Sequence, residues 1–280
     1  MSTLYDFHLL RIVKSQRISI YLGETRVKEE EMSATLTGLQ PMPATAAFGF
    51  LANGWRDMKA SGFKGSIYGL IFALMGYAIG FVYKNLWQVT MGLTAGFFLV
   101  GPFLCCGIYD ISRQLDRGYK PNVSASTMSW VRNWKSIAFF AAILTFFMIV
   151  WARVSVVLFA LFGSHSYPDL RDMISKIISL ENLEFLSIWA GVGFVFASLV
   201  FAISVVSVPM MLDRGSDTME SIGTSAKALW SNSTAMLVWA ACIVGLIGAS
   251  LVLFLPLLII TAPLVGHGTW HAYKTLVAPK

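Results

Sequence analysis

The sequence is dominated by long apolar segments that carry almost no charge. Residues 234–266 contain no acidic or basic side chain. Charged residues are only 13% of the chain, whereas about a quarter is usual in globular proteins. So few charges cannot cover the surface of a water-soluble fold of 280 residues. The composition therefore predicts an all-α, polytopic membrane bundle, and it excludes a soluble enzyme, a nucleic-acid-binding domain and a disulfide-stapled secreted module.

Six segments are long and apolar enough to cross a bilayer, which takes about 20 residues in a helix. We expect these spans at residues 67–83, 86–108, 137–162, 186–208, 234–255 and 257–273. Only Lys84 and Asn85 separate the first two spans, so these should form a tight hairpin.

Lysine and arginine are distributed unevenly around these spans. With six spans, 17 of the 21 basic residues fall on the side of both termini, three on the opposite side, and Arg153 within the third span. Cytoplasmic loops carry the excess of lysine and arginine in membrane proteins. We therefore expect both termini in the cytoplasm and a multi-pass membrane protein with the lipid bilayer as its main partner.

The membrane domain is expected to occupy residues 48–280. Residues 1–47 form an N-terminal extension that should be poorly ordered or partly mis-assigned, because Met32 directly follows three glutamates and offers an alternative start. Two segments have the apolar stripe of an interfacial helix. One is residues 169–181 on the outer surface, and the other runs from Phe48 to Met58 ahead of the first span.

The spans suggest three helical hairpins in tandem. The tetrapeptide Leu-Asp-Arg-Gly occurs at residues 115–118 and again at 212–215, each time after an even-numbered span. Glycine at its end suits the position that terminates a helix, and arginine before it suits lipid phosphates. The candidate functional polar residues of the cytoplasmic side lie in and near these copies, and they are Asp110, Arg113, Asp213 and Arg214.

Glycines recur on one face of each of the first two spans. They are Gly65, Gly69, Gly76 and Gly80 in or just before the first span, and Gly92 and Gly96 in the second. Small residues at this spacing let helix backbones approach closely in a membrane. We predict that the two spans pack on each other through these glycines; a glycine face that lines a pore is the alternative.

Arg153 is the only basic residue inside a span. A charged side chain at the bilayer centre is costly, so we expect Arg153 to reach the outer interface beside Trp151. The alternative is an ion pair or anion site within the bundle.

His267 and His271 are four residues apart on one face of the last helix. Two imidazoles at this spacing can chelate one metal ion, with a third ligand from Asp110, Asp213, Asp217, Cys105 or Cys106. The alternative is that both histidines form hydrogen bonds at the membrane interface. The chain has no phosphate-binding loop, dinucleotide fingerprint, Cys-x-x-Cys or serine-hydrolase motif, so no cofactor and no enzymatic reaction are predicted.

Three segments resemble a bacterial integral-membrane family known as domain of unknown function 2189. They are Gly54-Trp55-x-Asp57, the stretch from Gly101-Pro102 to Ser112-Arg113, and Gly266-His267-x-Thr269-Trp270-His271-x-Tyr273. The likeness covers about residues 48–277, and it implies a six-span inner-membrane protein without a known mechanism. Some members carry the label cytochrome c oxidase subunit I-like. A haem-copper core needs six histidine ligands, and this chain has four histidines in total.

These observations favour a non-enzymatic inner-membrane protein that is an accessory or assembly partner of a larger, respiratory or other, membrane complex. A transporter of small solutes or ions is the alternative. A third reading is a metal- or haem-handling protein that uses His267 and His271.

Overall fold

The computed structural model describes residues 42–85, 87–162 and 183–277. Within these ranges the regular elements are helices, which confirms the predicted all-α class. In chain order they are α2 (Ala46–Ala60), α3 (Ser66–Asn85), α4 (Trp87–Asp116), α5 (Val123–Thr127), the 3-10 helix η1 (Ser129–Asn133), α6 (Trp134–Phe162), α8 (Leu183–Ser204), α9 (Ser207–Arg214), α10 (Thr218–Ser231), α11 (Ser233–Leu253), the 3-10 helix η2 (Leu255–Leu257) and α12 (Leu258–Leu276). The predicted extension, up to residue 41, and the outer interfacial helix, residues 169–181, lie outside the described residues.

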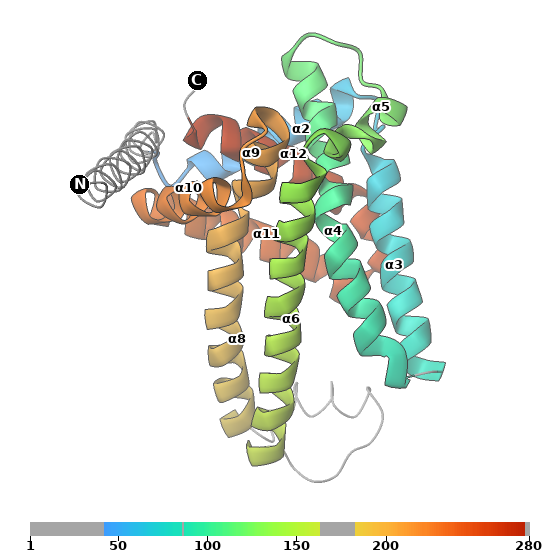
Figure 1. Ribbon diagram of the computed structural model, residues 1–280, viewed down its shortest axis with the longest axis vertical. Coiled ribbons are helices and arrows are strands. Elements are labelled where there is room, and N and C mark those ends of the chain that lie inside the picture. The colour runs from blue at the N-terminus through green and yellow to red at the C-terminus, as the bar shows by residue number, and fades with distance from the viewer. Residues whose placement is uncertain (1–41, 86, 163–182, 278–280) are drawn as a thin grey trace, which may run out of the picture.

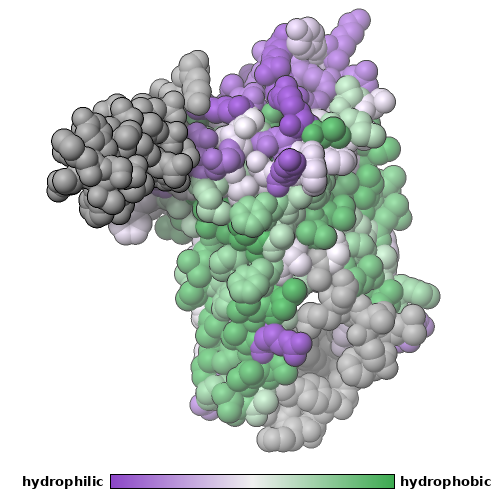
Figure 2. Space-filling model, viewed as in Figure 1, coloured by the Kyte–Doolittle hydropathy of each residue, from purple (hydrophilic) through white to green (hydrophobic). Residues whose placement is uncertain are grey.

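The long helices run side by side along the molecule. Helix α3 contacts α4, α4 contacts α6, and α6 contacts α8, while shorter helices gather at one end (Figure 1). The end that carries α2, α5, α9 and α10 is hydrophilic, whereas the surface along the long helices is hydrophobic (Figure 2). We call this hydrophilic end of the molecule the polar end.

Four helical stretches are long and apolar enough to cross a membrane: Ser66–Asn85, Val123–Phe162, Leu183–Arg214 and Ser233–Leu253. They coincide with the first, third, fourth and fifth predicted spans. The second and sixth predicted spans correspond to helices α4 and α12, which are outside this set of four. Six crossings and two cytoplasmic termini remain predictions.

Proline explains the interruption near the end of the fourth predicted span. Helix α8 ends at Ser204, and α9 begins at Ser207 with Pro209 in its first turn. The proline ring would collide with the carbonyl of Val205, four residues earlier, if one helix continued through both. The predicted span 186–208 is therefore two helices that meet at residues 205–206.

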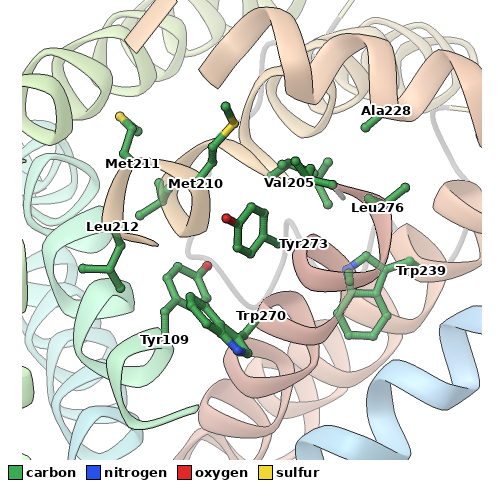
Figure 3. Packing of buried hydrophobic residues seen from close by; sticks show 14 of the residues in the cluster. Tyr109, Val205, Met210, Met211, Leu212, Ala228, Trp239, Trp270, Tyr273 and Leu276 are labelled. Carbon is green, nitrogen blue, oxygen red and sulfur yellow. The ribbon is translucent and has the colours of Figure 1, made fainter. Parts of the chain in front are cut away.

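The fully buried side chains are concentrated at the polar end and not along the long helices. Helix α8 buries none of its residues, whereas α9 buries Met210, Met211 and Leu212. Trp270 and Tyr273 of α12 lie between α4 and α9, with Tyr109 of α4 close by (Figure 3). The polar end thus has a core of the kind found in soluble proteins, and the long helices expose their apolar side chains, as lipid contact requires.

The predicted glycine packing needs a correction, because Gly69 and Gly76 of α3 face α12 and η2 and not α4. A β-carbon on Gly69 would lie 2.7 Å from the carbonyl oxygen of Leu258 at the start of α12. One on Gly76 would lie 3.1 Å from the side chain of Leu255. Gly80 and Gly96 face open space, and the surroundings of Gly92 are outside the described side chains.

The contact between α3 and α4 uses a different glycine. The ring of Tyr68 occupies the space that a side chain at Gly107 would need. Tyr68 is buried, and its hydroxyl forms a hydrogen bond with the Ser126 hydroxyl across 2.6 Å. Helices α3 and α4 therefore pack through Tyr68 on Gly107 and the apolar side chains around it, while α12 occupies the small-residue face of α3.

Candidate functional site

A buried polar cluster joins three helices at the polar end. Asp57 comes from α2, Ser112 from α4, and His267 and His271 from α12. The Ser112 hydroxyl lies 2.7 Å from Asp57 Oδ2 and 2.7 Å from His267 Nδ1. His271 Nε2 lies 2.8 Å from the same carboxylate oxygen of Asp57. We call these four residues the Asp57 network.

Glycines bring α2 and α12 close enough for the Asp57 network to form. A β-carbon on Gly54 would lie 2.8 Å from the backbone nitrogen of Gly268 and 2.8 Å from the carbonyl oxygen of Leu264. The two helix backbones are therefore in direct contact one turn before Asp57. His267 and His271 share one face of α12 because residues four apart are neighbours on a helix surface.

The hydrogen bonds fix which atoms carry protons. Ser112 has a single hydroxyl proton and donates it to the Asp57 carboxylate, which can only accept. The Ser112 oxygen must therefore accept the proton of His267 Nδ1. His271 donates its Nε2 proton to the same Asp57 oxygen. The Asp57 carboxylate on α2 thus accepts hydrogen bonds from two donors, one on α4 and one on α12.

Asp57 remains ionised in this setting. Burial alone would raise its pKa, but the hydrogen bonds from His271 and Ser112 favour the charged form and hold the pKa of Asp57 below 3.8. The carboxylate therefore carries its charge at neutral pH. Its two donors compensate for the loss of water around it.

The other side of the His267 ring has a different environment. His267 is fully buried, and Nε2 has no hydrogen-bond partner among the described residues. This nitrogen faces Gly65, at which a β-carbon would lie only 2.8 Å away. Gly65 is thus required because the imidazole fills the space beside it, and the glycine lies just before α3.

The two histidines do not present two free nitrogens to one point. Nδ1 of His267 and Nε2 of His271 are both engaged in the Asp57 network. Among the residues that the structure describes, no group of three histidine, cysteine, aspartate or glutamate side chains could hold a metal ion. The metal site at His267 and His271 remains a prediction from the spacing alone.

A second polar cluster contains both copies of Leu-Asp-Arg-Gly. Trp270 of α12 donates to Asp116 Oδ2 across 2.6 Å, and Tyr273 of α12 donates to Asp213 Oδ2 across 2.9 Å. The aspartates at the same place in the two tetrapeptides therefore each bind an aromatic side chain of one helix. Arg117 of the first copy also pairs with Asp213 of the second, at 3.4 Å.

Both tetrapeptides end in the predicted backbone conformation. Gly118 has φ +74° and Gly215 has φ +67°, and this left-handed region favours glycine. The larger repeat of three hairpins remains a prediction.

The remaining candidate residues are placed apart from the Asp57 network. Arg113 pairs with Asp110 and donates to the carbonyl of Leu212 across 3.0 Å, which ties α4 to α9. Arg214 donates to the Tyr273 hydroxyl across 3.1 Å. Arg153 is exposed on α6, as a side chain that reaches toward the interface would be.

Comparison with known proteins supports the membrane assignment. Residues 89–213 match the model of a family described as predicted integral membrane protein (DUF2189). The matched part of the chain, somewhat less than half of it, is therefore similar to this family. No curated protein and no solved structure matches the chain. The DUF2189 match runs from α4 into α9, so it includes Ser112 and the first tetrapeptide but neither α2 nor α12.

The arrangement around Ser112 differs from that of a serine hydrolase. In a Ser-His-Asp triad the imidazole stands between the serine and the carboxylate and takes the hydroxyl proton. Here Ser112 stands between His267 and Asp57 and gives its proton to the carboxylate. Ser112 and His267 are both 0% exposed, so no substrate reaches the hydroxyl in this conformation. The Asp57 network instead binds α2, α4 and α12 together.

Sequence reasoning identified His267 and His271 but gave no role to Asp57 or Ser112. Asp57 lies in the Gly-Trp-x-Asp segment, and Ser112 lies near the end of the Gly-Pro segment, so both were in the stretches that resemble the family. The available signal was that each of these two stretches contains a polar residue, Asp57 in one and Ser112 in the other. It could not reveal the contact, because Asp57 and Ser112 are 55 residues apart and Ser112 and His267 are 155 apart.

Proposed function

We propose that this protein is a non-enzymatic integral membrane protein that acts as an accessory or assembly partner of a larger membrane complex in the bacterial inner membrane. The observation that supports this role most is the burial of the polar groups that could react. Ser112 and His267 are inaccessible, and their hydrogen bonds hold α2, α4 and α12 together. A protein that uses its polar residues for rigidity is suited to present surfaces to a partner.

The long helices offer such surfaces within the membrane. Val244 on α11 is 70% exposed, and the neighbouring Gly245 has open space beside it. Trp239, on the same helix, is fully buried against Phe50, with ring centroids 5.6 Å apart. These two positions on one helix allow an outward-facing and an inward-facing site to be compared.

Photo-crosslinking in living cells tests the accessory role. A photoreactive amino acid in place of Val244 should give one discrete adduct that contains a second, identifiable membrane protein, because that side chain points away from the chain itself. The same amino acid in place of Trp239 should give none. Adducts with lipid alone from Val244, together with solute uptake by vesicles of the purified protein, would support the transporter alternative and reject the proposal.

We also propose the six-span topology, with α4 and α12 crossing the membrane beside the four helices identified above. It is supported by the contacts between α3 and α4, which follow each other closely in the chain, and by the excess of basic residues on one side. Reporter fusions should read periplasmic after Lys84 and cytoplasmic after Pro121. A periplasmic reading after Pro121 would show the opposite orientation.

A further inference from the structure

Helix α10 lies across the end of α8, where the hydrophilic surface of the molecule gives way to the hydrophobic one (Figures 1 and 2). It connects two membrane helices directly. The stretch Leu183–Arg214 ends four residues before it, and α11 begins two residues after its last residue, Ser231. Its place in the chain therefore keeps α10 at the level at which these helices leave the apolar layer.

The buried face of α10 is made mainly of hydroxyl groups. Its buried residues are Thr218, Ser221, Thr224, Ser225 and Ala228, and the partly buried Ile222 and Leu229 also pack against the core. Thr218 donates to the Ser136 carbonyl across 2.9 Å. Such a face would ordinarily be the outward one on a helix that rests on a water-soluble protein.

Ser225 gives this buried polar face a specific task. Its hydroxyl donates to the carbonyl of Ala202 across 2.7 Å and accepts the backbone N–H of Val206 across 3.3 Å. These two backbone groups flank the interruption between α8 and α9. Unpaired backbone groups are costly in an apolar layer, and the serine of α10 satisfies both.

The outward face of α10 carries two large apolar residues. Met219 is 58% exposed and Trp230 is 88% exposed. Gly223, between them, has open space where a β-carbon would lie, and Lys227 on the same side is also exposed. Tryptophan with a nearby lysine is typical of the boundary between lipid and water, because the indole prefers that layer and the lysine stem can reach the phosphates.

We propose that α10 is an interfacial helix that rests in the headgroup layer of the bilayer, with Met219 and Trp230 inserted between lipids. The reversal of the ordinary pattern, with hydroxyls inside and tryptophan outside, is what identifies lipid and not water as the contact of this face. Continuity with the apolar surfaces of α8 and α11 places that lipid next to it. Because Ser225 of α10 bonds the backbone at the interruption between α8 and α9, α10 also links that interruption to the bilayer boundary.

Spin labels on single cysteines test this proposal in the full-length protein. Cys105, Cys106 and Cys242 are first replaced by alanine, and labels are attached at Met219→Cys and Trp230→Cys in nanodiscs of phosphatidylcholine and phosphatidylglycerol. Tyr119→Cys is the matched control, because Tyr119 is also highly exposed but lies in the connection between α4 and α5, at the far polar end (Figure 1). Melting curves confirm that each labelled protein is folded.

The ratio of collisions with oxygen to collisions with a water-soluble nickel chelate reports the surroundings of each label. We expect a ratio above one at positions 219 and 230 and below one at position 119, since oxygen concentrates in lipid and the chelate in water. Ratios below one at all three positions would overturn the proposal, because they would place the outward face of α10 in water or against a partner that is missing from the purified protein.

Discussion

Replacing Gly69 by alanine should destabilise the protein by about 1–3 kcal/mol, the usual cost of overpacking a closely fitted contact. The added β-carbon would lie 2.7 Å from the carbonyl oxygen of Leu258 and 2.7 Å from the α-carbon of Ile259. Both atoms belong to the backbone, so no side-chain rotation relieves the clash, and α12 must move away from α3. Thermal unfolding in a mild detergent measures the loss.

Gly80 on the same helix is the matched control. It has open space beside it, so Gly80→Ala removes the flexibility of glycine without a clash. That variant should be neutral or more stable by up to about 1 kcal/mol, because alanine favours the helix. Equal destabilisation by Gly69→Ala and Gly80→Ala would mean that α12 does not occupy the glycine face of α3.

The error about this glycine face shows what a sequence can and cannot provide. The spacing of Gly65, Gly69 and Gly76 correctly predicts a helix surface that accepts close contact. The contacting helix could not be predicted, because the neighbour in the chain, α4, was the simplest choice. Helix α12 lies almost 200 residues further along and carries no periodic signal that pairs it with α3.

Elements dominated by a single local rule were predicted well. Apolar length predicts the four membrane helices, and terminal glycine predicts the left-handed ends at Gly118 and Gly215. The interruption at residues 205–206 was missed, although Pro209 was visible, because the apolar run continues across it. The segment from Phe48 to Met58 is helical as expected, but its buried face contacts α12 through Gly54 and Asp57, while Phe48 is exposed.

The Asp57 network lies beyond sequence reasoning for a physical reason. A carboxylate in an amphipathic helix ordinarily faces water, and nothing local distinguishes Asp57 from such a residue. Its burial depends on two donors that three-dimensional packing brings from α4 and α12. Histidines four apart were recognisable as a unit, but their partners were not.

Replacing Asp57 by alanine should be among the most destabilising single changes in the described part of the chain, at about 3–5 kcal/mol. It removes the acceptor of two buried donors, and hydrogen bonds to a charged group contribute about 1.5–3 kcal/mol each. Asp57→Asn keeps an acceptor oxygen but not the charge, so its loss should be smaller. Asp217→Ala is the control. Asp217 caps the exposed start of α10, and such a cap contributes about 1 kcal/mol.

The dependence on pH distinguishes this network from an ordinary surface contact. Because folding lowers the pKa of Asp57 below 3.8, its contribution is complete above the unfolded value and is lost only as the pH falls through the lower, folded value. The difference in unfolding free energy between wild type and Asp57→Asn should thus stay constant from pH 7 to about 5 and shrink below about 4. Nitrogen-15 spectra of the four histidines test the same network. They should show a hydrogen-bonded proton on Nδ1 of His267, and Ser112→Ala should weaken that hydrogen bond. If the difference in unfolding free energy between wild type and Asp57→Asn shrank between pH 7 and 5, the charge would belong to another group. An Asp57→Ala variant as stable as Asp217→Ala would show that the network does not hold α2 in place.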